Sequence, residues 1–272
     1  MSGALKNEFQ DKGFLWGTPY SISFDDQQKL IDYTLKHGWV VPSEMNVLPP
    51  FWVGMSLTDV PQEKKAHIPE EHRGRWMYLV RNRVELGWFW RDIEIAPIVQ
   101  RALEPMKPYF SAFTRVTIFL QVPNQALPPH RDLLPGNEYR DMESSHLTFS
   151  GDKKLRYEGD PWFAEFDRFE SNEFHRDQKF FNLKIPLSQN PNSPGKPYVI
   201  WQGKKYHYDS QGRFFFLNEV EIEHGADPVP FYRGVIFVDG TLNLKALENF
   251  PISTVEVSLS EYDLSKTQSA QK

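Results

Sequence analysis

The segment Gln121–Asp132, QVPNQALPPHRD, carries the clearest strand pattern of the chain directly into a His-x-Asp triplet. Over residues 113–121 apolar side chains recur at every second position, which is the period of a β-strand with one buried face. A Pro-Asn turn and two further prolines then restrict the backbone ahead of His130, where a ligand-binding side chain must be held rigidly. We therefore expect His130 and Asp132 to project from the end of a fixed strand.

The composition indicates a globular chain in which any metal site must be made of nitrogen and oxygen ligands. Its 272 residues are 40% hydrophobic and 15% aromatic, which suits one large domain with a sizeable core. The net charge of -5 comes from acidic and basic residues mixed along the sequence, so there is no basic stripe for a nucleic acid. Because the chain has no cysteine, only His, Asp and Glu side chains can bind a transition metal.

No stretch of the sequence is typical of a secretory or membrane protein. The start, MSGALKNEFQDKGFLWG, lacks a basic segment followed by an apolar run, and eighteen consecutive apolar residues occur nowhere. The sequence therefore predicts a soluble, cytoplasmic protein without a membrane partner.

The periodic segments predict a mainly β (α+β) fold with flanking N-terminal helices. Capping residues and helical spacing indicate a helix over Ser23–His37 that Gly38 ends, and a shorter helix is expected from Pro97 to Pro105. Short strands separated by turn clusters favour a sandwich or barrel of the jelly-roll kind. Besides residues 113–121, the expected strands are 179–187, 197–202, 212–218, 234–239 and 253–259.

We expect a single domain over residues 1–272 with a long central insertion. Residues 1–112 are predicted to give helical or irregular support, and residues 113–259 the jelly-roll core. Residues 133–177 are polar, acidic and rich in aromatics without a clear period, which is typical of an inserted loop. Its aromatics could close over a pocket as a lid or simply pack on the core. Residues 260–272 are predicted to be a polar tail.

Three His-x-Asp triplets compete for the role of a metal-binding pair. They are His130/Asp132, His175/Asp177 and His207/Asp209. The third lies in YHYDSQGR, which is typical of a hairpin turn, so we interpret it as solvated. The second follows FESNEF, where no strand pattern fixes the histidine. We favour the first because it ends a strand, and the second stays open as the alternative.

A further histidine and an arginine complete the candidate set. His224 ends the apolar–acidic alternation EVEIEH, and taken alone it could equally be a surface turn residue. Arg233 begins the strand RGVIFVDG on its inward face, where a buried guanidinium needs an anion. That anion could be Asp227, Asp239 or a glutamate. It could also be a bound carboxylate, which the planar guanidinium grips with two parallel hydrogen bonds.

Taken together, these motifs resemble the Fe(II)/2-oxoglutarate-dependent oxygenases, and most of all their aspartyl/asparaginyl β-hydroxylase-like branch. The resemblance covers roughly residues 116–239. It is carried by PPHRD, by FNLKIPLSQNP, by FFFLN six residues ahead of His224, and by HG followed by YRGVIFVD. It implies a double-stranded β-helix, which is a cupin-like jelly roll, as the core of the fold.

The resemblance also implies roles for individual residues. His130, Asp132 and His224 become the ligands of Fe(II), and Arg233 the partner of the distal carboxylate of 2-oxoglutarate. Asn182 and Lys184 stand where many relatives have an arginine and a histidine, and of these two we take Asn182 as a candidate cosubstrate contact. Two imidazoles and one carboxylate leave three adjacent positions on the metal, two for the keto acid and one for dioxygen. Because Asp132 leaves no vacancy for a halide, hydroxylation is expected and not halogenation.

The substrate class and two competing function classes stay open. Dioxygen is an implied partner, and a small molecule, a free amino acid or a peptide side chain fits as the substrate. A metal-binding cupin-type isomerase or ligand-binding jelly roll without oxygen chemistry is the leading alternative, with Arg233 then paired internally. A non-catalytic interaction domain with incidental histidines is the third possibility.

Overall fold

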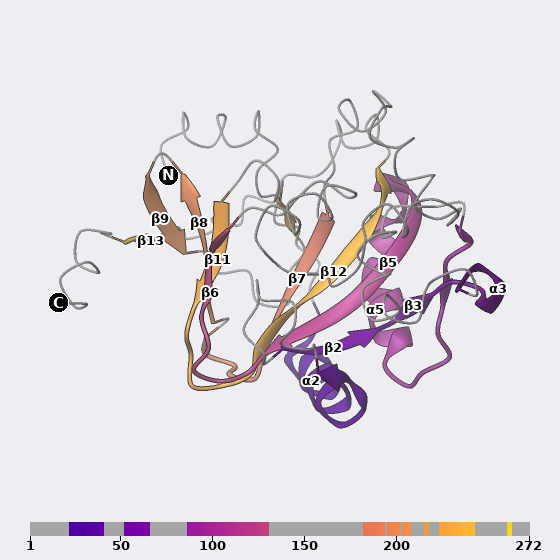
Figure 1. The fold of residues 1–272 in the computed structure, drawn as a ribbon, viewed down its shortest axis with the longest axis horizontal. Coiled ribbons are helices and arrows are strands. Elements are labelled where there is room, and N and C mark those ends of the chain that lie inside the picture. Colours follow the sequence, from indigo (N-terminus) through magenta and orange to yellow (C-terminus); the bar gives the residue numbers. More distant parts are fainter. Residues whose placement is uncertain are drawn as a thin grey trace, which may run out of the picture.

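The computed structural model describes nine stretches of the chain, and these are mainly β. They are residues 22–40, 52–65, 86–130, 182–193, 195–201, 203–207, 215–217, 223–242 and 260–262. Most of their strands lie in two antiparallel sheets, as Figure 1 shows. Within these stretches no helix is long and apolar enough to cross a membrane.

The larger sheet has six strands, and its centre is the long pair β5 and β12. In spatial order the strands are β1 (Trp39–Val40), β2 (Trp52–Ser56), β5 (Phe110–Gln121), β12 (Arg233–Leu242), β7 (Asn182–Ser188) and β10 (Phe215–Leu217). All neighbouring pairs are antiparallel. The register sets Arg233, the first residue of β12, opposite Gln121, the last residue of β5.

The smaller sheet has five strands and carries both histidines of the favoured site. In spatial order they are β13 (Ser260–Tyr262), β9 (Lys204–His207), β8 (Lys196–Trp201), β11 (Glu223–Asp227) and β6 (Leu127–His130). Two further short strands, β3 (Thr58–Asp59) and β4 (Phe89–Trp90), pair with each other, and the single-turn helix α3 (Gln62–Lys65) follows β3.

Successive strands from β5 to β12 are distributed between the two sheets. β5, β7, β10 and β12 belong to the larger sheet, and β6, β8, β9 and β11 to the smaller one. The connections β5–β6 and β11–β12 both pass at the end where the two sheets approach each other in Figure 1. The backbone N–H of Asn124 donates to the carbonyl oxygen of Val229 at 2.7 Å and ties these two connections together.

One face of the larger sheet packs against helices and forms the apolar core. The helix α2 (Phe24–His37) begins after Ser23, whose hydroxyl accepts a hydrogen bond from the Asp26 N–H at 3.2 Å. The helix α5 (Ala96–Leu103) runs into the 3-10 helix η3 (Glu104–Tyr109). Their apolar stripes meet alternate residues of the sheet. The buried core includes Leu30, Ile31, Val99, Leu103, Met106, Val116, Ile118, Leu120, Leu183, Ile185, Leu187, Ile236 and Val238.

Gly38 ends α2, although not by the left-handed conformation that a terminal glycine usually supplies. Its φ of -73° is ordinary extended backbone. A Cβ at this position would lie 2.4 Å from the carbonyl oxygen of Thr34 and 2.6 Å from that of Gly54 on β2. The glycine is therefore required by the close approach of the chain to the sheet.

The other face of the larger sheet is polar, charged and buried. Leu127 of the smaller sheet packs against Trp52 and Phe119 on this face, so the face is turned toward the smaller sheet. Arg115 and Asp239 form an ion pair there, with Nε and Oδ2 2.6 Å apart and both side chains almost fully buried. The buried polar residues of this inner face include Ser56, Arg115, Thr117, Gln121, Lys184, Ser188, Arg233 and Asp239.

Both predicted helices and five of the six predicted strands are present with shifted ends, and the described residues contain eight further strands that the sequence pattern does not show. Both predicted helices form, and the predicted strands over 113–121, 179–187, 197–202, 212–218 and 234–239 overlap β5, β7, β8, β10 and β12. The additional strands are β1, β2, β3, β4, β6, β9, β11 and β13. β6 reads LPPH, and its two prolines are tolerated because it is an edge strand.

The predicted division into support, core, insertion and tail stays a prediction. Residues 133–177 and the expected strand over 253–259 lie outside the described residues. β13 occupies the first three residues of the predicted polar tail and pairs with β9.

Candidate metal and carboxylate site

The two histidines that the sequence places 94 positions apart (224 minus 130) are direct neighbours in the smaller sheet. His224 on β11 is the backbone partner of His130 on β6 in an antiparallel pair. Such partners have Cα atoms about 4.5–5.5 Å apart. The pairing is irregular on the next step, where Ala226 faces Leu127. A β-bulge at this point bends β6 just before the His-x-Asp triplet.

His224 lies on the inner face of the smaller sheet. Leu127 faces Ala226 across the β6–β11 pair and packs onto the larger sheet. Because side chains two positions apart share one face of a strand, His224 points the same way as Ala226. The side chain of His224 is 5% exposed. It is therefore not the surface turn residue that the sequence left as an alternative.

Arg233 is buried on the facing side of the larger sheet, as the strand pattern predicts. Its side chain is 4% exposed, and its Nη2 donates a hydrogen bond to Oε1 of Gln121 at 2.5 Å. Gly195, in the turn before β8, has a φ of +91°, and a Cβ there would come within 2.7 Å of Cδ of Arg233. The arginine stem is thus held between a neighbouring strand and a tight turn.

The two aspartates considered as internal partners of Arg233 contact other cations. Asp239 pairs with Arg115. Asp227 contacts Lys205 and His207, with distances of 2.8 Å from Oδ1 to Nζ and 2.8 Å from Oδ2 to Nε2. Each of these aspartates therefore has another cation as a close partner.

Another buried cation, besides Arg115 and Arg233, lies further along the inner face. Lys184 on β7 is opposite Phe237 on β12, and its Nζ lies 4.7 Å from the centroid of the Phe237 ring. Asn182 begins the same strand, and its backbone pairs with Leu217 of β10. Its predicted contact with a cosubstrate stays a prediction, because the side chain is outside the described part of the structure.

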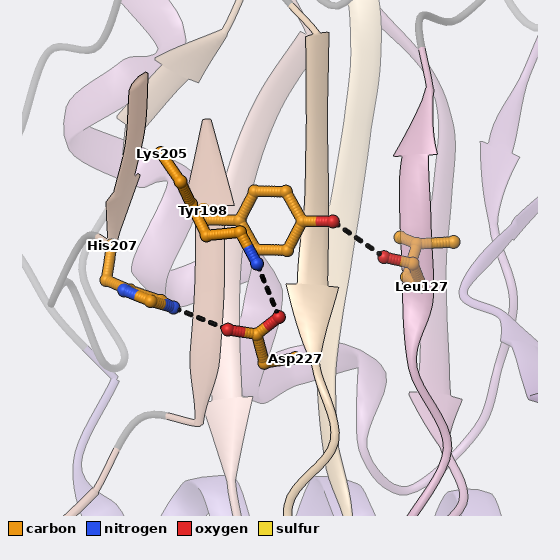
Figure 2. Close-up of polar contacts among 5 residues, drawn as sticks. All are labelled: Leu127, Tyr198, Lys205, His207 and Asp227. Carbon is orange, nitrogen blue, oxygen red and sulfur yellow. Dashed lines mark hydrogen bonds and ion pairs between the residues drawn. The ribbon is translucent and has the colours of Figure 1, made fainter. Parts of the chain in front are cut away.

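The outer face of the smaller sheet carries a compact polar cluster, which Figure 2 shows in close-up. Tyr198 lies across Gly225, and its hydroxyl donates to the carbonyl oxygen of Leu127 at 3.3 Å. Burial, followed by the negative charges of Asp227 and Glu223, raises the pKa of Tyr198 to about 12. The phenol is therefore neutral at physiological pH, and it ties β8 to the strand that ends in His130.

His207 belongs to this cluster, which corrects the interpretation of the His207/Asp209 triplet as solvated turn residues. His207 is the last residue of β9 and is hydrogen-bonded to Asp227, so a strand and not a turn holds it. Its backbone pairs with Tyr198, which lies on the face opposite to His224. Asp209 lies outside the described residues.

Replacing Asp227 with asparagine is expected to lower the free energy of unfolding by about 1–2 kcal/mol at pH 7, because two charge-assisted hydrogen bonds are weakened. Burial raises the pKa of Asp227, but the bonds from His207 and Lys205 outweigh it and lower the pKa to about 2. The stabilisation is fully present above about pH 4 and is lost as the pH falls toward 2.

Urea unfolding of both proteins between pH 7 and pH 2 measures this effect. The difference between wild type and Asp227→Asn should shrink toward zero at the acid end. Glu104→Gln is a matched control, because its ion pair with Lys107 is exposed and should contribute less than about 0.5 kcal/mol. If the difference in unfolding free energy between wild type and Asp227→Asn did not change with pH, the ionised carboxylate of Asp227 would not be its source.

Several predicted site residues lie outside the described residues. They are Asp132, His175 and Asp177, and the side chain of His130 is also outside the described part of the structure. Among the residues that the structure describes, no group of three or more metal-binding side chains gathers. Gln121 and Gly195 are neighbours of Arg233 that the sequence pattern does not single out. The strand register brings Gln121 to Arg233, and the turn before β8 brings Gly195 to it.

Comparisons with known proteins give no family match, since neither a family model nor a curated protein matches the chain. Solved structures similar to it include three enzymes. One is a Trichoplax adhaerens prolyl hydroxylase in complex with a hypoxia inducible factor oxygen degradation domain peptide, with 11% identity over 89% of each chain and a TM-score of 0.41. Another is a 2OG-Fe(II) oxygenase family oxidoreductase from Burkholderia pseudomallei, with 10% identity over 88% of this chain and 91% of that chain and a TM-score of 0.40. The third is a prolyl-4-hydroxylase from Pseudomonas putida, with 10% identity over 85% of this chain and 94% of that chain and a TM-score of 0.36.

Proposed function

We propose that this chain is an Fe(II)- and 2-oxoglutarate-dependent oxygenase that hydroxylates a small molecule or an amino-acid or peptide side chain. The observation that carries the proposal is the register of the smaller sheet, which pairs His130 with His224. The buried Arg233 follows nine positions later on the facing sheet. A buried histidine whose strand neighbour is a second histidine, together with a buried arginine on the facing sheet, would suit a metal and a keto acid held together.

The donor set fits a ferrous ion. Residues directly opposite each other in an antiparallel pair project from the same face, so the register favours both imidazoles binding one metal. Asp132, two positions beyond His130, adds the carboxylate that completes a facial set of two histidines and one acid. The chain offers no thiolate that would favour zinc or an iron–sulfur cluster.

The distribution of strands supports a double-stranded β-helix as the core. The eight strands from β5 to β12 divide into one set of four in each sheet, with β5, β12, β7 and β10 in one and β9, β8, β11 and β6 in the other. This order is that of a chain wound as a jelly roll. In such a core the inner faces of both sheets line a common interior, where His224 and Arg233 would lie.

The proposed reaction consumes 2-oxoglutarate, dioxygen and a substrate R–H, and yields succinate, carbon dioxide and R–OH. Bound iron would supply the activation of dioxygen that protein side chains cannot provide. Arg233 would bind the distal carboxylate of the keto acid through its planar guanidinium, and thereby orient the other end toward the histidines. Leu127, Trp52 and Phe119 pack between the sheets and would exclude water beside the site.

The motif resemblance supports a narrower version of this proposal. PPHRD, FNLKIPLSQNP and YRGVIFVD are similar to the aspartyl/asparaginyl β-hydroxylase-like branch, which includes hydroxylases of amino acids. We therefore propose an amino acid or a peptide side chain as the first substrate class to examine.

Purified protein with ferrous iron, 2-oxoglutarate and air should form succinate slowly even without a substrate. Quantifying succinate by chromatography, with and without iron, tests the reaction class. An amino acid or peptide that is a substrate should increase the rate further. Iron-loaded protein that forms no succinate, alone or with any member of an amino-acid and peptide panel, would support a metal-binding jelly roll without oxygen chemistry.

A further inference from the structure

We propose that Gln121 is a positioning residue that fixes the guanidinium of Arg233 for the carboxylate of the cosubstrate. The inference rests on the proposed function above and assigns the orientation of its carboxylate-binding arginine to one neutral side chain. Gln121 is 3% exposed and lies directly opposite Arg233 in the β5–β12 pair.

The amide of Gln121 has one favourable orientation. Its Oε1 accepts a hydrogen bond from Nη2 of Arg233, and its Nε2 donates to the carbonyl oxygen of Gln125. A guanidinium can only donate and a carbonyl can only accept. Reversing the amide would therefore set two donors against each other and two acceptors against each other. Both ends of the side chain are fixed by partners of opposite character.

The connection that holds Gln121 is itself held in place. Gln125 belongs to the short turn between β5 and β6, in which Asn124 adopts a left-handed φ of 64°. The Asn124 N–H donates to the carbonyl oxygen of Val229 in the β11–β12 connection. Gln121 thus links Arg233 to the same turn that leads into His130.

A neutral acceptor suits this position better than a charged one. Gln121 engages one of the five N–H donors of Arg233 without reducing its positive charge. A carboxylate at position 121 would form an internal ion pair with the guanidinium and would compete with an incoming carboxylate. It would also face the Gln125 carbonyl with an acceptor, where the amide now donates.

The stem of Arg233 is restrained from a second direction. Gly195 approaches Cδ so closely that a Cβ would clash with it, and β7 places Ser188 opposite Arg233 on the other side. The stem is therefore confined by the turn and the neighbouring strands, and Gln121 fixes its polar end. Such preorganisation lowers the entropic cost of binding a dicarboxylate.

The test compares Gln121→Glu, Gln121→Ala and Thr117→Val. Thr117 is a matched control because it lies on the same face of β5, is equally buried and faces Phe237 instead of Arg233. Anaerobic calorimetry on the iron-loaded proteins gives the dissociation constant of 2-oxoglutarate, and a separate titration gives that of ferrous iron. Circular dichroism confirms that each variant is folded.

We expect Gln121→Glu to weaken 2-oxoglutarate binding by more than about tenfold, Gln121→Ala by about three- to tenfold, and Thr117→Val by less than about twofold. Iron affinity should change by less than about threefold in all three variants. If Gln121 had only a structural role, Gln121→Ala would bind 2-oxoglutarate more weakly than Gln121→Glu, because glutamate keeps an acceptor for Arg233.

Two outcomes distinguish this inference from the proposed function. If wild type binds 2-oxoglutarate and Gln121→Glu binds it within twofold of wild type, the positioning role is wrong while the proposed function stands. If iron-loaded wild type binds no 2-oxoglutarate, the proposed function itself fails. Should Gln121→Glu not fold, Gln121→Met is measured in its place, and an unchanged affinity there overturns the positioning role.

Discussion

Alanine in place of His224 should lower the affinity for ferrous iron by at least about a hundredfold and remove 2-oxoglutarate-dependent succinate formation. Loss of a residue that only orients a metal ligand typically costs 10–100-fold in affinity, so loss of the ligand itself should cost at least that much. The substitution should change the fold little, because β11 is paired on both sides with β8 and β6. Anaerobic titration with ferrous iron measures the affinity.

His207 provides a matched control in the same sheet. It is also a strand histidine, but it lies on the outer face and contacts Asp227. His207→Ala should leave iron affinity within about threefold of wild type, although it removes a hydrogen bond from the outer cluster. Equal iron affinity in the two variants would mean that His224 is not a ligand.

The second large effect is expected at Arg233. Arg233→Met should raise the KM for 2-oxoglutarate by about a hundredfold or more, since removing one partner of a buried charge pair costs about 2–5 kcal/mol. The KM of Arg233→Lys should lie between those of wild type and Arg233→Met, because lysine keeps the positive charge but lacks the planar guanidinium that binds a carboxylate through two hydrogen bonds. Steady-state succinate formation at varied 2-oxoglutarate measures both variants.

A shortened cosubstrate separates the role of Arg233 from a general loss of structure. 2-Oxobutanoate has the same keto-acid end as 2-oxoglutarate but lacks the distal carboxylate. Wild type should use it poorly, and Arg233→Met should use it about as well as wild type does. If Arg233→Met loses activity toward both keto acids to the same degree, the arginine is needed for folding and not for the distal carboxylate.

The sequence predicts the larger sheet better than the smaller one, and the reason is local. β5 and β12 are long and alternate clearly, because one face packs on α2 and α5 while the other is polar. β6, β9 and β11 are short, and β6 contains two prolines. Their pairing is long-range, so no local pattern shows that residues 130 and 224 are neighbours.

Of the candidate site, too, the sequence predicts the features that depend on a single strand, but not the contacts between distant strands. The inward direction of Arg233 follows from period two in its own strand, and its burial confirms that prediction. The contact with Gln121 depends on the β5–β12 register, which joins residues 112 positions apart. The misinterpreted His207 shows the same limit: its turn-like surroundings conceal a strand that is fixed by β8 and by Asp227.

The most direct test of the account is one anaerobic ferrous iron titration of wild type, His130→Ala and His175→Ala. The β6–β11 register pairs His130 with His224, so we expect only His130→Ala to lose tight binding, while His175→Ala binds iron as wild type does. Tight binding that survives in His130→Ala and disappears in His175→Ala would contradict the assignment of the metal site.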